Sequence, residues 1–115
     1  RRMYAGGDIL LIPSRYEPCG LTQMIAMRYG CVPLARSTGG LKDTIFDNPD
    51  NEFNNGFLFT EANAESFAQV MRRAVKSFHS KAEWKKLQMN GMTTDFSWEK
   101  SAIEYAKIYT KLKGE

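Results

Sequence analysis

Cysteine, histidine and net charge are scarce in this sequence, and each scarcity excludes a class of protein. The 115 residues include two cysteines, too few for a disulfide framework, and one histidine. Cys19 and Cys31 lack metal-ligand spacing, so we expect no metal site and a reduced, intracellular setting. The net charge is +3 and the basic residues are scattered, so we expect neither nucleic acid nor a membrane as a partner.

Long apolar runs are also missing. None approaches the ~20 residues of a membrane span, and no signal peptide opens the chain. Hydrophobic residues make up 43% and charged residues 25%, which is ordinary for a globular domain with a modest core. Residues 1–5 resemble the end of a helix already under way, so we expect the chain to be a fragment of a longer protein.

The first third of the chain predicts a strand, a helix and a second strand. The apolar run at residues 9–12 is typical of a strand buried on both faces of a parallel sheet. Residues 21–29 are apolar almost all round, which predicts a buried helix that ends at Gly30. Residues 31–35 predict the second strand, in which Pro33 should leave the pairing late or one-sided.

The turn between the first strand and the helix could hold a sugar at one end and a phosphate at the other. Glu17 can accept hydrogen bonds from neutral hydroxyls, and Gly20 lets a ligand approach the backbone. The amides of Leu21 and Thr22 lie where a helix begins, and unpaired N–H groups together with the macrodipole favour a phosphate there. The alternative is an acidic turn residue beside an ordinary glycine.

A second strand, glycine turn and helix start follow at residues 37–41, with a short helix predicted over residues 42–46. Thr38, Gly39 and Gly40 either face a ligand or form a plain connecting turn. In parallel sheets, ligands bind at the carboxyl ends of the strands, where both turns would lie.

The remaining residues predict a surface loop, a third strand and three helices. In the loop, residues 47–55, we expect Asp47 and Asp50 to be solvated turn carboxylates rather than metal ligands. The third strand covers residues 56–59. The helices are expected to begin at Asn63 as a cap, at a capping box of Ser80 with Glu83, and at Ser97 as a cap. The last helix carries an aromatic stripe, Trp98, Tyr105 and Tyr109, that needs a surface to pack on.

Strands and helices therefore alternate, which predicts an α/β domain with a parallel sheet. Three strands make a small sheet, so we expect preceding strand–helix units to be missing.

Several motifs, in this order and spacing, resemble the bacterial and plant glycogen and starch synthases, which are retaining glucosyltransferases of the two-domain GT-B fold. The motifs are Tyr4-Ala5-Gly6-Gly7-Asp8, Pro13-Ser14-Arg15-Tyr16-Glu17-Pro18-Cys19-Gly20-Leu21-Thr22-Gln23, Ala26-Met27-Arg28-Tyr29-Gly30, Thr38-Gly39-Gly40-Leu41 with Asp43-Thr44, Gly56-Phe57, and Phe96-Ser97-Trp98. Related transferases usually have Phe in place of Cys19, and a second Glu where this chain has Ile25.

The resemblance implies that residues 1–115 are a partial Rossmann-like parallel sheet with helices, from the C-terminal, nucleotide-sugar-binding domain of a GT-B fold. It implies that the parent protein transfers glucose from ADP-glucose to the non-reducing end of an α-1,4-glucan, glycogen or starch, with retention. ADP-glucose is a substrate, and no cofactor or metal is implied. The setting would be the bacterial cytoplasm or the plastid stroma. The N-terminal domain that helps to hold the acceptor is absent, so the isolated chain is expected to be inactive.

The resemblance also implies roles for individual residues. Glu17 would be the catalytic residue, positioning the donor glucose rather than attacking it covalently. The substrate-binding residues would be Cys19 and Gly20 at the sugar, Leu21 and Thr22 at the diphosphate, and Thr38, Gly39 and Gly40 beside the donor. The alternatives are a non-catalytic nucleotide-sugar-binding module and an interaction domain whose glycine turns are only architectural.

Overall fold

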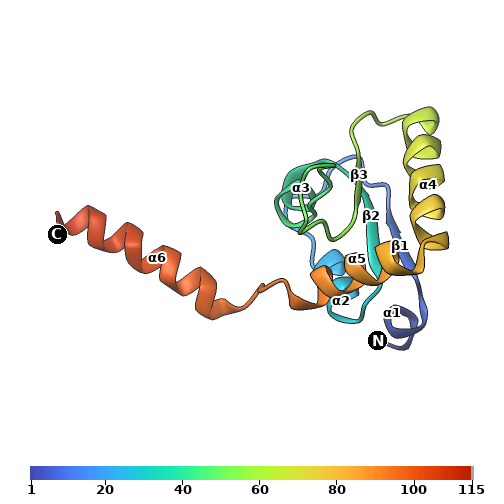
Figure 1. The fold of residues 1–115 in the computed structure, drawn as a ribbon. Helices are drawn as coiled ribbons and strands as arrows, with labels where there is room; N and C mark the ends of the chain where they lie inside the picture. The colour runs from blue at the N-terminus through green and yellow to red at the C-terminus, as the bar shows by residue number, and fades with distance from the viewer. Residues whose placement is uncertain (115) are drawn as a thin grey trace.

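The computed structural model describes residues 1–114 and has the alternating order of strands and helices that the sequence predicts (Figure 1). A three-stranded parallel sheet runs in the order β1–β2–β3. The strands are β1 (Ile9–Ile12), β2 (Val32–Arg36) and β3 (Phe57–Phe59). The helices are α1 (Arg2–Gly6), α2 (Thr22–Arg28), α3 (Gly39–Thr44), α4 (Ala64–His79), α5 (Lys81–Thr93) and α6 (Trp98–Lys113). The predicted α/β class is confirmed.

Pro33 lies inside the central strand and is paired on one side only. It is in register with Leu10 of β1, whereas the pairing with β3 begins one residue later, at Leu34 with Phe57. A proline has no N–H to donate to a neighbouring strand, so it is tolerated where one side of the strand is not yet paired. The one-sided pairing predicted from the sequence is confirmed.

Helices cover both faces of the sheet and create two apolar clusters (Figure 1). Alternation along β2 sends Val32 and Leu34 to one face and Ala35 to the other. The first cluster lies against α4 and α5 and consists of Val32, Leu34, Phe57, Phe59, Val70, Ala74, Trp84 and Leu87. The second lies against α2 and α3 and consists of Ile12, Met27, Ala35, Leu41 and Ile45.

Two predictions of complete burial were wrong. Leu11 of β1 is 45% exposed, because β1 is an edge strand of the described sheet and α4 and α5 pack over β2 and β3 instead. Helix α2 is shorter than predicted and is not buried all round. It buries Gln23, Ala26 and Met27, whereas Ile25 is 39% exposed on the other side.

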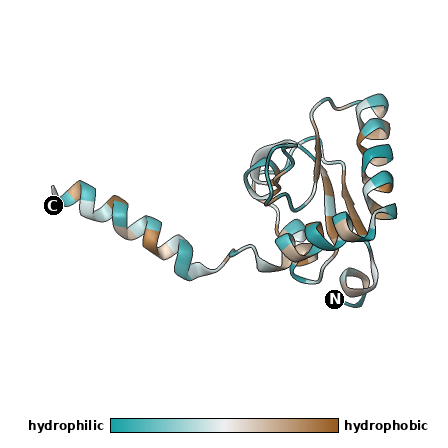
Figure 2. Cartoon of the chain, in the orientation of Figure 1, coloured by the Kyte–Doolittle hydropathy of each residue, from teal (hydrophilic) through white to brown (hydrophobic). Residues whose placement is uncertain are grey.

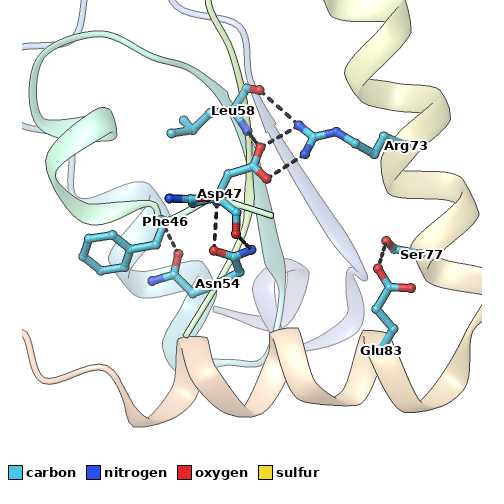
Figure 3. Close-up of polar contacts among 9 residues, drawn as sticks. Phe46, Asp47, Asn54, Leu58, Arg73, Ser77 and Glu83 are labelled. Atoms are coloured by element: carbon cyan, nitrogen blue, oxygen red, sulfur yellow. Dashed lines mark hydrogen bonds and ion pairs between the residues drawn. The ribbon is translucent and has the colours of Figure 1, made fainter. Parts of the chain in front are cut away.

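The predicted helix caps were confirmed at two ends and wrong at a third. The Asn63 side chain accepts from the Ser66 N–H at 2.9 Å, and Ser97 caps α6 in the same way. The capping box of Ser80 with Glu83 does not form, since the Ser80 side chain caps nothing. The Glu83 carboxylate accepts instead from the hydroxyl of Ser77 in the preceding helix (Figure 3).

Asp47 is not a solvated turn carboxylate, so that prediction was also wrong. Its side chain is 7% exposed and accepts two hydrogen bonds from the Arg73 guanidinium, at 2.7 and 2.6 Å (Figure 3). It also accepts from the Leu58 N–H at 2.7 Å. Asp47 therefore ties the loop to β3 and α4. Asp50 is exposed as predicted. Residues 1–114 contain no cluster of three or more side chains of the kinds that hold a metal.

Helix α6 extends away from the remainder of the fold (Figure 1), and the hydropathy colouring of Figure 2 shows hydrophobic positions interspersed with hydrophilic ones along it. All of its residues are exposed, including Trp98 at 86% and Tyr109 at 65%. The radius of gyration is 15.7 Å, compared with about 13 Å for a compact domain of this length. Within residues 1–114, the predicted aromatic stripe is therefore uncovered. None of the described helices is both long and apolar enough to cross a bilayer.

Candidate functional site

The two glycine turns lie side by side at the carboxyl edge of the sheet. The first follows β1, the second follows β2, and the strands are parallel neighbours. The Gly40 N–H joins the turns by donating to the carbonyl oxygens of Glu17 and Pro18, each at 3.1 Å. The structure thus brings together all the residues that the sequence analysis assigned to a ligand site.

Gly39 and Gly40 are held against the first turn so closely that no side chain fits. A Cβ added to Gly39 would overlap the Glu17 carbonyl, with the carbonyl carbon at 2.8 Å. A Cβ added to Gly40 would overlap the Cys19 carbonyl, with the Cys19 Cα at 2.7 Å. Gly39 also has a positive φ of 47°, which favours glycine. The packing of the first turn therefore requires both glycines, whether or not a ligand approaches them.

A buried side-chain amide connects the two turns a second time. Gln23 is 0% exposed, and its Nε2 donates to the carbonyls of Cys19 at 3.2 Å and Gly20 at 2.9 Å. The same nitrogen donates to the Thr44 hydroxyl at 3.1 Å, and that hydroxyl donates to the Gly40 carbonyl at 2.7 Å. Gln23 and Thr44 therefore clamp the first turn to α3. The sequence analysis missed both residues, although a glutamine on an otherwise apolar helix was a signal for the first.

The groups of the first turn that the sequence analysis assigned to a ligand are accessible. Glu17 and Gly20 are half-buried, whereas Cys19, Leu21 and Thr22 are exposed. Gly20 has a φ of 72°, the left-handed conformation that turns the chain into α2. Within residues 1–114, the backbone N–H groups of Cys19, Leu21 and Thr22 donate to no protein group. A carboxylate and several unused amides thus share one short stretch of backbone.

Two hollows lie beside the turn pair rather than over it. A groove of ≈ 790 Å³ runs between α2 and the end of α5, lined by residues that include Met24, Arg28 and Met92. A second, of ≈ 740 Å³, lies where α2 and α3 face α6, with Phe46 and Trp98 among its residues. Glu17 lines neither. Leu21 lines both grooves, and the exposed residues Cys19, Leu21 and Thr22 leave the first turn open to solvent.

Comparison with protein families gives one match that covers most of the chain. Residues 1–88 match the family model "Glycosyl transferases group 1". Among characterised relatives, the chain is 54% identical to the glycogen synthase of Geotalea daltonii over 109 residues, which are 94% of this chain and 22% of that protein. It is 50% identical to glycogen synthase 1 of Synechocystis over 100% of this chain and 24% of that protein. The chain thus spans about a quarter of the length of these relatives.

Solved structures show the same fold. The catalytic domain of starch synthase IV from Arabidopsis thaliana, bound to ADP and acarbose, superposes with a TM-score of 0.83. It is 46% identical and covers 94% of this chain and 23% of that one. Sucrose-phosphate synthase from Thermosynechococcus elongatus superposes with a TM-score of 0.68 at 28% identity, covering 96% of this chain and 27% of that one.

Proposed function

Because the chain belongs to the group 1 glycosyl transferases, and within them to the glycogen and starch synthase family, we propose that it is a segment of the C-terminal, nucleotide-sugar-binding domain of such a synthase. The protein that carries it transfers glucose from ADP-glucose to the non-reducing end of an α-1,4-glucan and retains the anomeric configuration. The reaction takes place in the bacterial cytoplasm or in the plastid stroma of a plant.

One observation carries this proposal. A half-buried carboxylate, Glu17, lies within three residues of a glycine turn whose amides are unused, and a second glycine turn is packed against it. A nucleotide sugar needs these two kinds of group, because its hydroxyls are neutral donors and its diphosphate is an anion. A carboxylate repels the phosphates but accepts hydrogen bonds from the hydroxyls, while backbone amides at a helix start favour the phosphates.

The roles of the residues follow from this division. Glu17 accepts hydrogen bonds from the donor glucose and fixes the orientation of its ring, with the amides of Cys19 and Gly20 beside it. The amides of Leu21 and Thr22 face the diphosphate and stabilise the negative charge that develops on it as the glycosidic bond breaks. The second turn, Thr38 with Gly39 and Gly40, borders the donor from the other side. The starch synthase IV structure supports a site for a nucleotide in this family, since that protein was solved bound to ADP and acarbose.

Orientation is the main contribution that these residues make to the rate. Holding a donor and an acceptor in a reactive geometry can lower a barrier by about 7–11 kcal/mol. The described turns are open to solvent, so the acceptor and the exclusion of water depend on other parts of the protein. The isolated chain is accordingly expected to have no transferase activity.

The test is Glu17→Gln in the full-length protein that carries this chain. The change keeps the size of the side chain and removes its charge, and charge-assisted hydrogen bonds are worth about 1.5–3 kcal/mol. The turnover number with ADP-glucose should fall about tenfold to a hundredfold. The affinity for ADP, measured by calorimetry, should stay within about threefold, because the phosphates contact amides instead of Glu17.

Glu52→Gln is the matched control, since Glu52 is exposed in the surface loop and far along the chain from the two turns. Its turnover should equal that of the wild type. Unchanged turnover in Glu17→Gln would remove Glu17 from the site. A wild-type protein that elongates glycogen from neither ADP-glucose nor UDP-glucose would overturn the proposed function as a whole and would favour a non-catalytic binding module.

A further inference from the structure

Arg36 is a cation at the carboxyl edge of the sheet that the proposed mechanism does not use. It is the last residue of β2, and strand alternation places it on the same face as Val32 and Leu34. An apolar residue would continue that pattern. Arg36 is instead a half-buried cation whose Nε is buried.

The Arg36 side chain donates a hydrogen bond to the loop that carries Glu17. Its Nη1 donates to the carbonyl oxygen of Arg15 at 3.0 Å. Residues 13–16 follow β1, which ends at Ile12. Within residues 1–114, the bond from Arg36 is the one hydrogen bond made to their backbone. Packing adds little, because Pro13, Arg15 and Tyr16 are exposed and Ser14 is only half-buried.

The charge of the Arg36 guanidinium and its Nε–H group have no partner among residues 1–114. Within residues 1–114, no carboxylate lies within ion-pairing distance of Arg36, and its buried Nε has no hydrogen-bond partner. A buried donor without a partner costs stability and calls for an explanation. The backbone beside it is firmly held, since the Ser37 N–H donates to the Phe59 carbonyl at 2.8 Å. Arg36 therefore reaches from a rigid strand end to the first half of the loop, whereas Gly40 and Gln23 hold its second half.

We propose that Arg36 is a positioning residue: it anchors the Arg15 carbonyl and thereby fixes the Glu17 carboxylate relative to the second glycine turn. The inference rests on the proposed function, because it assigns the anchor a task in orienting the donor sugar. Glu17 is held on its other side by the Gly40 N–H. The two contacts, at the Arg15 carbonyl and at the Glu17 carbonyl, hold the backbone from which the Glu17 side chain projects.

The test uses the full-length protein with Arg36→Met, Arg36→Lys and the control Arg72→Met, whose side chain is 71% exposed on α4. Arg36→Met should lower the turnover number with ADP-glucose about tenfold to a hundredfold, with ADP affinity within about threefold of the wild type. Arg36→Lys can still donate one hydrogen bond and should recover part of the loss. Arg72→Met should behave as the wild type does.

A double-mutant cycle separates positioning from a general structural effect. If Arg36 acts through Glu17, Arg36→Met should cost about twofold or less in a Glu17→Gln background, because the carboxylate that it positions is already gone. A full tenfold or greater loss in that background would overturn the proposal, as would an unchanged turnover in Arg36→Met or a parallel loss of ADP affinity.

Three further outcomes also have a defined meaning. If Arg36→Met does not fold, the same cycle is run with Arg36→Lys and decides in the same way. If the wild-type protein transfers glucose but the cycle is additive, the positioning role fails while the proposed function stands. If the wild type transfers no glucose, the proposed function fails and this inference fails with it.

Discussion

Gly40→Ala is the smallest change that tests whether the spacing of the two glycine turns matters. The added methyl group would point at the backbone of the first turn, with the Cys19 carbonyl carbon at 2.6 Å and its Cα at 2.7 Å. Carbon atoms prefer separations of about 3.5–4.0 Å. Because the opposing atoms belong to the backbone, they cannot rotate aside as a flexible side chain would. The turns must separate by about 1 Å to relieve the overlap.

The Gly40→Ala change should lower both the free energy of unfolding and the turnover number. Overpacking of this kind costs about 1–3 kcal/mol. Separation of the turns also weakens the Gly40 N–H contacts with Glu17 and Pro18, both at 3.1 Å. A displacement of about 1 Å at a reacting centre can lower a rate about a hundredfold. If Glu17 orients the donor, the loss of turnover should therefore exceed what the loss of stability alone would cause.

The assay measures turnover with ADP-glucose and the midpoint of thermal unfolding for the full-length Gly40→Ala variant. Gly6→Ala is the matched control, because a Cβ at Gly6 meets nothing within 4 Å. That control should keep wild-type turnover and can gain about 0.5–1 kcal/mol from the helix preference of alanine. Turnover within about twofold of the wild type for a folded Gly40→Ala protein would refute the reasoning that the close approach of the turns sets the site.

Two further predictions concern groups outside the site. Asp47→Ala should lower the free energy of unfolding by about 2–3 kcal/mol, because it leaves the Arg73 guanidinium without its carboxylate. Denaturant titration should show a change of about 0.5 kcal/mol or less for the exposed Asp50→Ala in the same loop, and equal effects would contradict the assigned role. Burial and, secondarily, Asp8 raise the pKa of Cys31 above 9.0. The unfolded thiol therefore ionises first as the pH passes that value, and stability should fall more steeply in the wild type than in Cys31→Ala; identical slopes would argue against it.

The features that could be predicted from the sequence depend on neighbours in the chain. The apolar run at residues 9–12 and the glycine turns marked the strand–helix order, because strands and turns have short-range patterns. The caps at Asn63 and Ser97 were predicted because a cap bonds to a residue three positions later. The failed capping box at Ser80 shows the limit of this rule. The Glu83 carboxylate accepts a hydrogen bond from the Ser77 hydroxyl on the preceding helix instead.

The missed features depend on partners far away in the sequence. The carboxylate of Asp47 is buried because Arg73, 26 residues later, is folded against it. Gln23 and Thr44 act as a clamp across 21 residues. The short helix α3 begins at Gly39, earlier than predicted, because the Gly40 N–H is drawn to the first turn. No local pattern contains these pairings, so they could not be predicted without the fold.

The candidate site could be predicted from the sequence only in part. That both turns meet at one edge of the sheet followed from parallel pairing alone, since parallel strands end on the same side. That Gly39 and Gly40 are required by contact with Glu17 and Cys19 did not follow, because the sequence analysis left open whether they face a ligand or form a connecting turn and could not name the residues they pack on. The roles of all these residues toward a donor remain predictions that the proposed variants test.

The contacts around Glu17 imply that different parts of the protein orient the ligand-binding groups and exclude water from them. The backbone that carries Glu17 is held by the Gly40 N–H at the Glu17 carbonyl and by Arg36 at the Arg15 carbonyl, while Gln23 bonds to the turn that follows. Groups held in this way are oriented before a ligand arrives, which is the condition for effective electrostatic stabilisation. The same turns are open to solvent within residues 1–114, so they do not supply the exclusion of water that strengthens such interactions. A protein that transfers a sugar needs both oriented groups and exclusion of water, and the described residues supply the oriented groups.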